Sequence, residues 1–116
     1  MRFSLLIGIA ILSLGILIPV QAQKGPKPAP PSYTKHVDPL LKKHCVSCHR
    51  AEAAYGGLRL DAPEGVKKAV VPKDPKKSAL SKRMKGEGPM MPPAGKLKEA
   101  DIKLVDEWIK SGAQFK

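Results

Sequence analysis

The stretch Cys45-Val46-Ser47-Cys48-His49 decides the fold of this chain. Its two thiols lie three positions apart, and an imidazole follows directly. This spacing suits thioether bonds from Cys45 and Cys48 to the two vinyl groups on one edge of a porphyrin. The turn between the thiols then directs the imidazole of His49 toward the iron, for which it is a suitable donor. The pattern therefore predicts one covalently attached haem c with His49 as an iron ligand.

Three other kinds of site are compatible with the same five residues. A structural zinc site needs four ligands, but Cys48 and His49 are adjacent, and His36 and His44 do not form a second closely spaced pair. A redox-active Cys-x-x-Cys expects a strand before it and a helix after it, whereas here a helix leads in and a loop leads out. A plain disulfide suits an oxidising compartment. Haem attachment is favoured over all three.

The N-terminus has the pattern of an export signal covering residues 1–22. A basic start precedes an apolar run over residues 3–20, which Pro19 breaks, and Val20 and Ala22 are small residues at the two positions that a signal peptidase recognises. We expect cleavage after Ala22 and a periplasmic or otherwise exported protein. The alternative is an uncleaved membrane anchor, because about 18 apolar residues can just span a bilayer.

The rest of the chain is basic and predicts one small domain. A chain of 116 residues is long enough for one domain and not for two. Without Arg2 the formal net charge falls from +11 to about +10. Residues 23–32 contain four prolines with two lysines and one glycine, which predicts an extended, solvated tether before a domain over residues 33–116. Only 4% of the residues are aromatic, so we expect the apolar porphyrin to replace part of the core.

Apolar residues at helical spacing predict an all-α domain. The first helix covers Val37 to His44, and it either starts at Asp38-Pro39 or begins at Ser32 with Pro39 inside it. A short helix is expected between Pro63 and Pro72, a third over residues 78–84, and a long one over residues 98–111. No segment alternates with period two, so we expect no sheet.

A Gly/Pro-rich loop offers a second ligand to the iron. Residues 86–93, Gly-Glu-Gly-Pro-Met-Met-Pro-Pro, hold two thioethers in a loop whose prolines restrict φ. Methionine is usually core filler, but a loop without helical period is a poor place for core residues. Met84, on a predicted helix, is expected to pack, and His36 would make a bis-His site from the start of the domain. The residues alone leave Met90 and Met91 as equal candidates.

The order of motifs resembles that of the planctomycete-type cytochrome c, a class of small bacterial c-type cytochrome domains. The resemblance runs from about Val37 to Phe115. Its motifs are VDPLL at 37–41, CVSCH at 45–49, GGLRLD at 56–61, VPKDPKKSAL at 71–80, MPP at 91–93 and WIKSGA at 108–113. It implies a small cytochrome c-like helical fold wrapped around one haem, with Met91 as the distal ligand. The chain departs from the family at Lys73, where glycine is frequent, and at Lys98, where a Ser or Thr cap is common.

Ligation by His49 and Met91 predicts an electron carrier and not a catalyst. Six-coordinate iron leaves no position for a substrate, and a thioether ligand favours the reduced state. Two other functions remain open. A haem protein that binds or senses a small ligand would have a labile methionine, and a haem subunit of a larger oxidoreductase would co-purify with that enzyme.

The basic charge near the cysteines predicts the kind of partner. Lys42, Lys43 and Arg50 flank the haem motif and favour docking to a redox protein with an acidic surface. General solubility or weak attraction to anionic lipid are the alternatives. We expect a monomer that contacts a membrane only if the N-terminal segment is uncleaved. No nucleic-acid-binding motif is present, so nucleic acid is not an expected partner.

Overall fold

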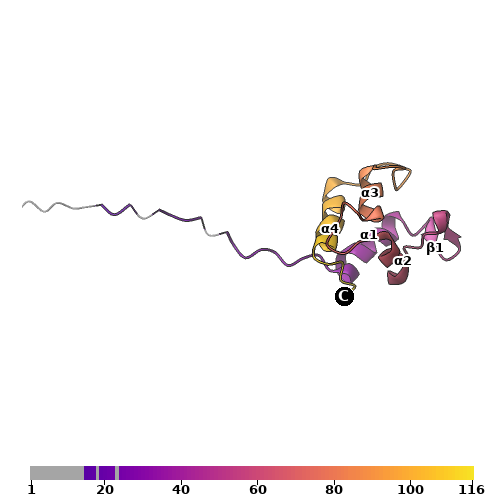
Figure 1. Ribbon diagram of the computed structural model, residues 1–116, viewed down its shortest axis with the longest axis horizontal. Helices are drawn as coiled ribbons and strands as arrows, with labels where there is room; N and C mark the ends of the chain where they lie inside the picture. The colour runs from indigo at the N-terminus through magenta and orange to yellow at the C-terminus, as the bar shows by residue number, and fades with distance from the viewer. Residues whose placement is uncertain (1–14, 18, 23) are drawn as a thin grey trace, which may run out of the picture.

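The computed structural model describes residues 15–17, 19–22 and 24–116 (Figure 1). Residues 24–30 are exposed, lack regular secondary structure and lead away from the folded part. Most of the predicted export signal, residues 1–14 and 18, lies outside the described residues, so its cleavage stays a prediction. Within the described part of the chain, no helix is both long and apolar enough to span a membrane.

The folded part is mostly helical, as predicted. A π-helical turn, η1 (Tyr33–Val37), continues into α1 (Asp38–His44). Three further helices follow, α2 (Pro63–Ala69), α3 (Ala79–Lys85) and α4 (Glu99–Lys110). Each of the expected helices is present, and their ends differ from the predicted ones by at most three residues, the largest difference being α2, which ends at Ala69.

The first helix begins before Pro39, so the second of its two predicted starts is the better one. The N–H of Val37 donates to the carbonyl of Ser32 at 3.4 Å, and the N–H of Asp38 donates to Tyr33. Proline has no N–H to donate and crowds the carbonyl four residues earlier. The wider hydrogen bonds of η1 precede this point, and Pro39 lies inside a continuous helical segment.

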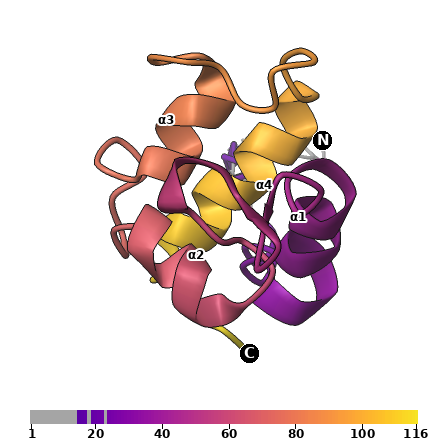
Figure 2. The ribbon, with the colours of Figure 1, turned by 90° about the vertical axis from the view of Figure 1, so that its right-hand side faces the viewer.

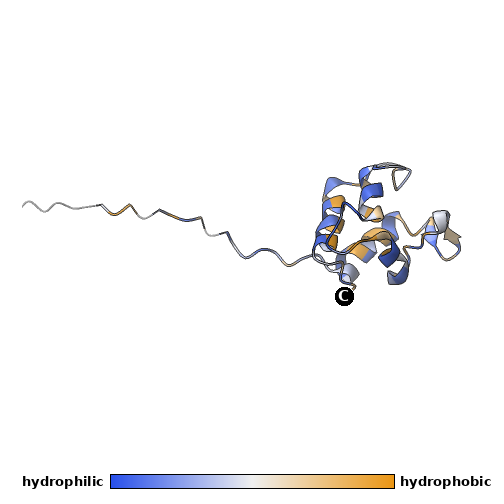
Figure 3. Ribbon diagram, viewed as in Figure 1, coloured by the Kyte–Doolittle hydropathy of each residue, from blue (hydrophilic) through white to orange (hydrophobic). Residues whose placement is uncertain are grey.

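The core lies between α4 and the first helix. Ile102, Val105, Trp108 and Ile109 form the buried stripe of α4 and are at most 2% exposed. Figure 2 shows α4 crossing the centre of the folded part, and Figure 3 shows apolar residues concentrated on the inward sides of the helices. Tyr33 packs on this stripe, with its ring centroid 5.5 Å from that of Trp108. Leu60, Leu80 and Met84 belong to the same core and also line the cavity described below.

The expectation of no sheet was wrong. Two short antiparallel strands, β1 (His49–Arg50) and β2 (Ala53–Ala54), pair His49 with Ala54 and Arg50 with Ala53. A 3-10 turn, η2 (Tyr55–Gly57), follows β2. Strands of two residues are too short to show alternation in a sequence. The ladder fixes the chain directly after the cysteine motif, so the all-α prediction holds for the packing but not for this segment.

A buried serine organises the connection between α2 and α3. The Ser78 side chain is fully buried, and its Oγ accepts a hydrogen bond from the N–H of Val71 at 2.8 Å. The same hydroxyl donates to the carbonyl of Asp74 at 2.8 Å. A buried hydroxyl without partners would cost free energy, and here its hydrogen-bonding capacity is satisfied.

The two departures from the family pattern have visible local effects. Lys73 adopts a φ of +69°, a left-handed conformation in which glycine is favoured, and its N–H donates to Ile109 at 2.7 Å. Lys98 precedes α4 and makes no side-chain capping bond. Both positions are therefore places where this chain gives up local stability.

Candidate functional site

A large, mostly apolar cavity lies beside the cysteine motif. Its volume of about 670 Å³ is within the range of small-molecule and cofactor sites. Its lining comes from the end of α1, the segment from the cysteine motif to residue 60, helix α3 and the loop that follows α3. Four predicted site residues, Cys45, Cys48, His49 and Met91, all line this one cavity.

The turn after α1 presents both thiols to the cavity. The N–H groups of Cys48 and His49 both donate to the carbonyl of Cys45, at 3.2 and 3.0 Å. Because of this tight turn, the side chains of Cys45 and Cys48, three positions apart, both line the cavity. Cys45 is half-buried and Cys48 is exposed, so the cavity reaches the surface at Cys48.

The imidazole of His49 is oriented by a backbone carbonyl. Its Nδ1 lies 3.1 Å from the oxygen of Leu58. A carbonyl oxygen can only accept, so Nδ1 carries the proton of the neutral ring and Nε2 keeps a free lone pair. The N–H of Leu60 donates to the carbonyl of His49 at 2.7 Å and holds the same segment. The hydrogen bond from Nδ1 to the Leu58 carbonyl is typical of a histidine that binds a metal through Nε2.

The loop over residues 86–93, here called the methionine loop, separates its two methionines. Met91 is half-buried and lines the cavity, whereas Met90 is 42% exposed and does not. The N–H of Met91 donates to the carbonyl of Arg83 in α3 at 3.0 Å, which ties the loop to that helix. The structure thus brings Met91, and not its neighbour, to the cavity that His49 lines.

The other candidate ligands have different environments. Met84 also lines the cavity, but it is only 2% exposed and belongs to the helix core, as its spacing predicted. His36 does not line the cavity, and its Nδ1 accepts a hydrogen bond from the N–H of Ser32 at 3.0 Å. His44 lines the cavity at the last position of α1.

Two glycines shape the cavity wall through their backbone conformation. Gly56 and Gly57 have φ of +66° and +72°, and an added Cβ at either position would meet no atom within 4 Å. Glycine is favoured at both positions because the turn requires a positive φ, and not because neighbouring atoms would collide with a side chain. Gly56, Leu58 and Leu60 line the cavity, but Gly57 does not.

Two cavity residues were missed by the sequence analysis. Arg83 lines the cavity from α3, and the 66% exposed Tyr55 lines it from η2. Arg83 follows Leu80 by three residues, so helical periodicity places the two on the same side of α3 and could have identified Arg83. Tyr55 lies in a turn and has no periodic signal.

The donor set does not fit the competing sites. Among the described residues, no group of three or more His, Cys, Asp or Glu side chains could hold a metal ion, as structural zinc requires. Both cysteines are free thiols. Burial, and secondarily the nearby Cys48, raise the pKa of Cys45 to about 11, whereas a reactive thiol needs a lowered pKa.

The same donor set fits a haem c. Two thiols line the cavity, one half-buried and one exposed, and its walls are largely apolar, as a porphyrin requires. An imidazole and a thioether, the pair that iron takes in cytochromes c, line the same space. Cys45 and Cys48 would hold the group covalently, and His49 and Met91 would bind its iron.

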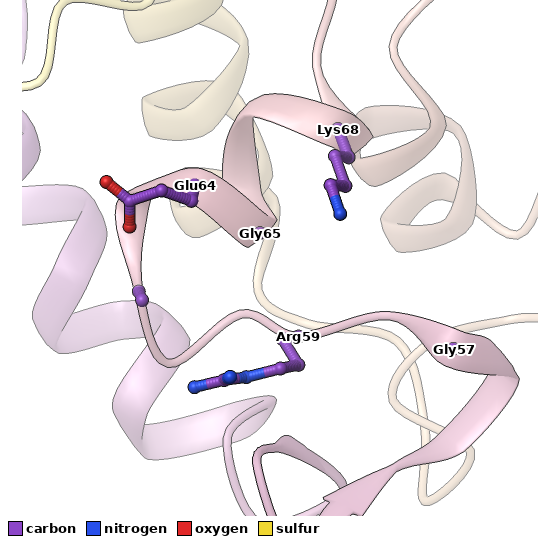
Figure 4. Close-up of a pocket in the computed structure, with 6 residues that line it drawn as sticks. Gly57, Arg59, Glu64, Gly65 and Lys68 are labelled. Carbon is purple, nitrogen blue, oxygen red and sulfur yellow. The ribbon is translucent and has the colours of Figure 1, made fainter.

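A second, smaller cavity lies between α2 and residues 57–62. Its volume is about 340 Å³, and Figure 4 shows Arg59 on one side with Glu64 and Lys68 of α2 on the other. Arg59 is already paired with Asp61, at 2.9 Å. An added Cβ on Gly65 would lie 2.0 Å from the carbonyl oxygen of Arg59. Helix α2 therefore packs directly on the backbone next to Leu58, whose carbonyl orients His49.

A comparison with known families agrees with this site. A protein-family model described as Planctomycete cytochrome C matches residues 45–95, a segment that starts at Cys45 and contains His49 and Met91. No match is found among curated proteins or among solved structures. The match indicates a haem-binding c-type cytochrome. Over residues 45–95 the chain is therefore similar to the Planctomycete cytochrome C model, and the resemblance predicted from the motifs is confirmed over these residues.

Proposed function

We propose that this protein carries single electrons between redox partners through one haem c, attached at Cys45 and Cys48 and ligated by His49 and Met91. The observation that carries the proposal is the convergence of these four side chains on one cavity. When bound, haem c supplies reversible one-electron chemistry at its iron. The protein contributes attachment, orientation and exclusion of other ligands.

The residues of the cavity divide these tasks. The carbonyl of Leu58 holds the Nδ1 proton of His49 and leaves Nε2 as the metal-binding atom. Met91 would supply a thioether to the iron of a bound haem, and a filled ligand set would disfavour ligand sensing and catalysis. Cys48 lies at the exposed end of the cavity, so a partner protein can come close to the bound group.

The proposed location is the periplasm or another compartment outside the cytoplasm. Residues 1–22 have the pattern of a cleaved signal, and haem c is attached after export. A cleaved signal leaves a protein that meets its partners by diffusion, and an uncleaved one keeps it at the membrane. The mass of the purified N-terminus distinguishes the two forms.

The proposed partner has an acidic docking surface. Near the cysteine motif, Lys42 pairs with Asp38 at 2.6 Å and Arg50 with Glu52 at 3.6 Å. Lys43 is exposed and has no ion pair in the described part of the chain. Lys43 is therefore the motif-flanking cation whose charge is not compensated nearby.

An electrode coated with carboxylates serves as a model of that partner. We expect Lys43→Glu to slow electron exchange with it more than Lys103→Glu, the same charge change on α4. High salt should remove the difference, because it screens charges more than about 10 Å apart at 0.1 M. Equal rates for the two variants would contradict docking at the cysteine end.

Three methionine variants test the ligand assignment. Leucine replaces the thioether with an apolar group of similar volume, so Met84→Leu and Met90→Leu are matched controls for Met91→Leu. We expect the far-red charge-transfer band of the oxidised holoprotein to disappear only in Met91→Leu, with a lower reduction potential. A wild-type protein with covalent haem but no such band would instead favour the ligand-binding function. Loss of the band in Met84→Leu alone would assign the ligand to α3.

A further inference from the structure

We infer that Arg83 is a positioning residue, whose guanidinium holds the methionine loop on α3 and keeps Met91 from leaving the iron. The inference rests on the proposed function, because it concerns how firmly Met91 is held. Arg83 is the last but two residue of α3 and lines the large cavity. In Figure 2 the chain after α3 runs over the end of the helices, where few other elements cover it.

The backbone carbonyl of Arg83 binds both ends of the methionine loop. It accepts from the N–H of Gly86 at 3.1 Å and from that of Met91 at 3.0 Å. One further bond, from the N–H of Glu87 to the carbonyl of Lys82 at 2.9 Å, closes the end of the helix. The loop is thus closed on itself at a single turn of α3.

The side chain of Arg83 lies across this loop. Its Nη1 donates to the carbonyl of Glu87 at 3.4 Å. Gly88 has a φ of +90°, and a Cβ there would lie 1.8 Å from the same Nη1. The guanidinium therefore occupies the space that a side chain at position 88 would need. Within the described residues Arg83 forms no ion pair, whereas nearby Lys85 pairs with Asp106 of α4 at 2.6 Å.

Little else holds the methionine loop in place. Residues 86–90 are all exposed, so burial of apolar side chains contributes little to their position. A loop fixed by a few hydrogen bonds opens more readily than a packed helix. Removing the guanidinium contact should therefore increase the fraction of protein in which Met91 has left its place.

Imidazole binding to the oxidised holoprotein measures that fraction. Imidazole can take the iron position only when Met91 is away, so its apparent affinity is proportional to the open population. The matched pair is Arg83→Ala and Lys82→Ala, which remove one positive charge each from neighbouring exposed positions of α3. We expect about fivefold tighter apparent imidazole binding in Arg83→Ala, because that variant loses the hydrogen bond from the guanidinium to the loop. We expect no change in Lys82→Ala. The free energy of unfolding in urea should fall in Arg83→Ala by no more than this fivefold change corresponds to, because the contact is lost from the closed state only, and it should not fall in Lys82→Ala.

The outcomes of this experiment distinguish a failure of the proposed role of Arg83 from a failure of the proposed electron-carrier function. Equal imidazole affinity in the two variants, with the far-red band present in both, overturns the role of Arg83 and leaves the proposed function standing. A wild-type holoprotein without the band overturns the proposed function, and the inference with it. A loss of urea stability in Arg83→Ala that is much larger than the change in imidazole affinity corresponds to would show a general structural role and also overturn the inference.

A second variant tests the contact from the other side. Gly88→Ala should push the guanidinium away and also strengthen apparent imidazole binding. Because the strain of alanine at this φ acts by itself, the same substitution is made in the Arg83→Ala background. We expect a smaller effect there, since the contact is already lost. Effects of equal size in both backgrounds would show that Gly88 and Arg83 act independently, against the inference.

Discussion

On the α4 side of the molecule Val105 and Trp108 are fully buried, whereas in the methionine loop Met90 is 42% exposed. The helical framework, defined here as η1, α1 and α4, is held by packed apolar side chains. The cavity wall, defined here as residues 49–60 and the methionine loop, is held mainly by backbone hydrogen bonds, glycine turns and one arginine. The contrast indicates that the framework carries most of the folding stability. The conformation of the wall depends on fewer packing contacts, so the proposed haem would contribute to it.

The largest expected effect is on the framework. Trp108→Ala removes a fully buried ring and its hydrogen bond to the carbonyl of Gln114 at 2.9 Å. We expect a loss of about 3–5 kcal/mol in the free energy of unfolding, as for other buried aromatic residues. Urea unfolding of the holoprotein followed by far-ultraviolet circular dichroism measures it. Lys103→Ala, at an exposed position of the same helix, is the control. Similar losses in the free energy of unfolding for the two variants would contradict the claim that the packed framework carries the folding stability.

An intermediate effect is expected where helix α2 packs on the cavity wall. Gly65→Ala would bring a Cβ to 2.0 Å from the carbonyl oxygen of Arg59, a backbone atom that cannot move alone. We expect a cost of about 1–3 kcal/mol, as for other overpacked sites. Because Arg59 adjoins Leu58, the visible spectrum should change with the stability. Gly25→Ala, in the tether where a Cβ meets nothing, is the control, and unchanged stability in Gly65→Ala would refute the close packing of α2.

A gain in stability is expected at Lys73. Its φ of +69° is unfavourable for a residue with a Cβ, and its side chain is exposed. Lys73→Gly should therefore stabilise the holoprotein by about 1 kcal/mol, because relief of the left-handed strain exceeds the added chain entropy. The matched variant is Lys76→Gly, an exposed lysine of the same connection without positive φ, which should lose stability. A loss in both would contradict the strain at position 73.

The smallest effect is expected at Tyr33. Its hydroxyl is buried and has no hydrogen-bond partner among the described residues, and burial raises the pKa of the phenol. Tyr33→Phe removes an unsatisfied polar atom and keeps the ring contacts with Trp108 and Phe115. We expect the free energy of unfolding to change by less than about 0.5 kcal/mol or to rise slightly. A marked loss would show that the hydroxyl has a partner in solution.

The framework could be predicted from the sequence, since its signals are local and periodic. The spacing of Ile102, Val105 and Ile109 identified α4, and the pair Cys45 and Cys48 followed by His49 identified the cavity entrance. The β1–β2 ladder was missed because four residues carry no alternating pattern. The contact between Arg83 and Gly88 could not be predicted either, since it depends on the path of a loop in space. Met91 was preferred to Met90 through family resemblance, and only the structure shows which of them lines the cavity.

The most direct measurement is the visible spectrum of the exported, purified protein before and after denaturation. We predict that haem stays with the denatured wild-type chain, with one haem per protein. Cys45→Ala and Cys48→Ala should each weaken the attachment, and the double variant should release the haem completely. A wild-type chain that denatures without retaining haem would contradict covalent attachment at Cys45 and Cys48, and with it the proposed electron carrier.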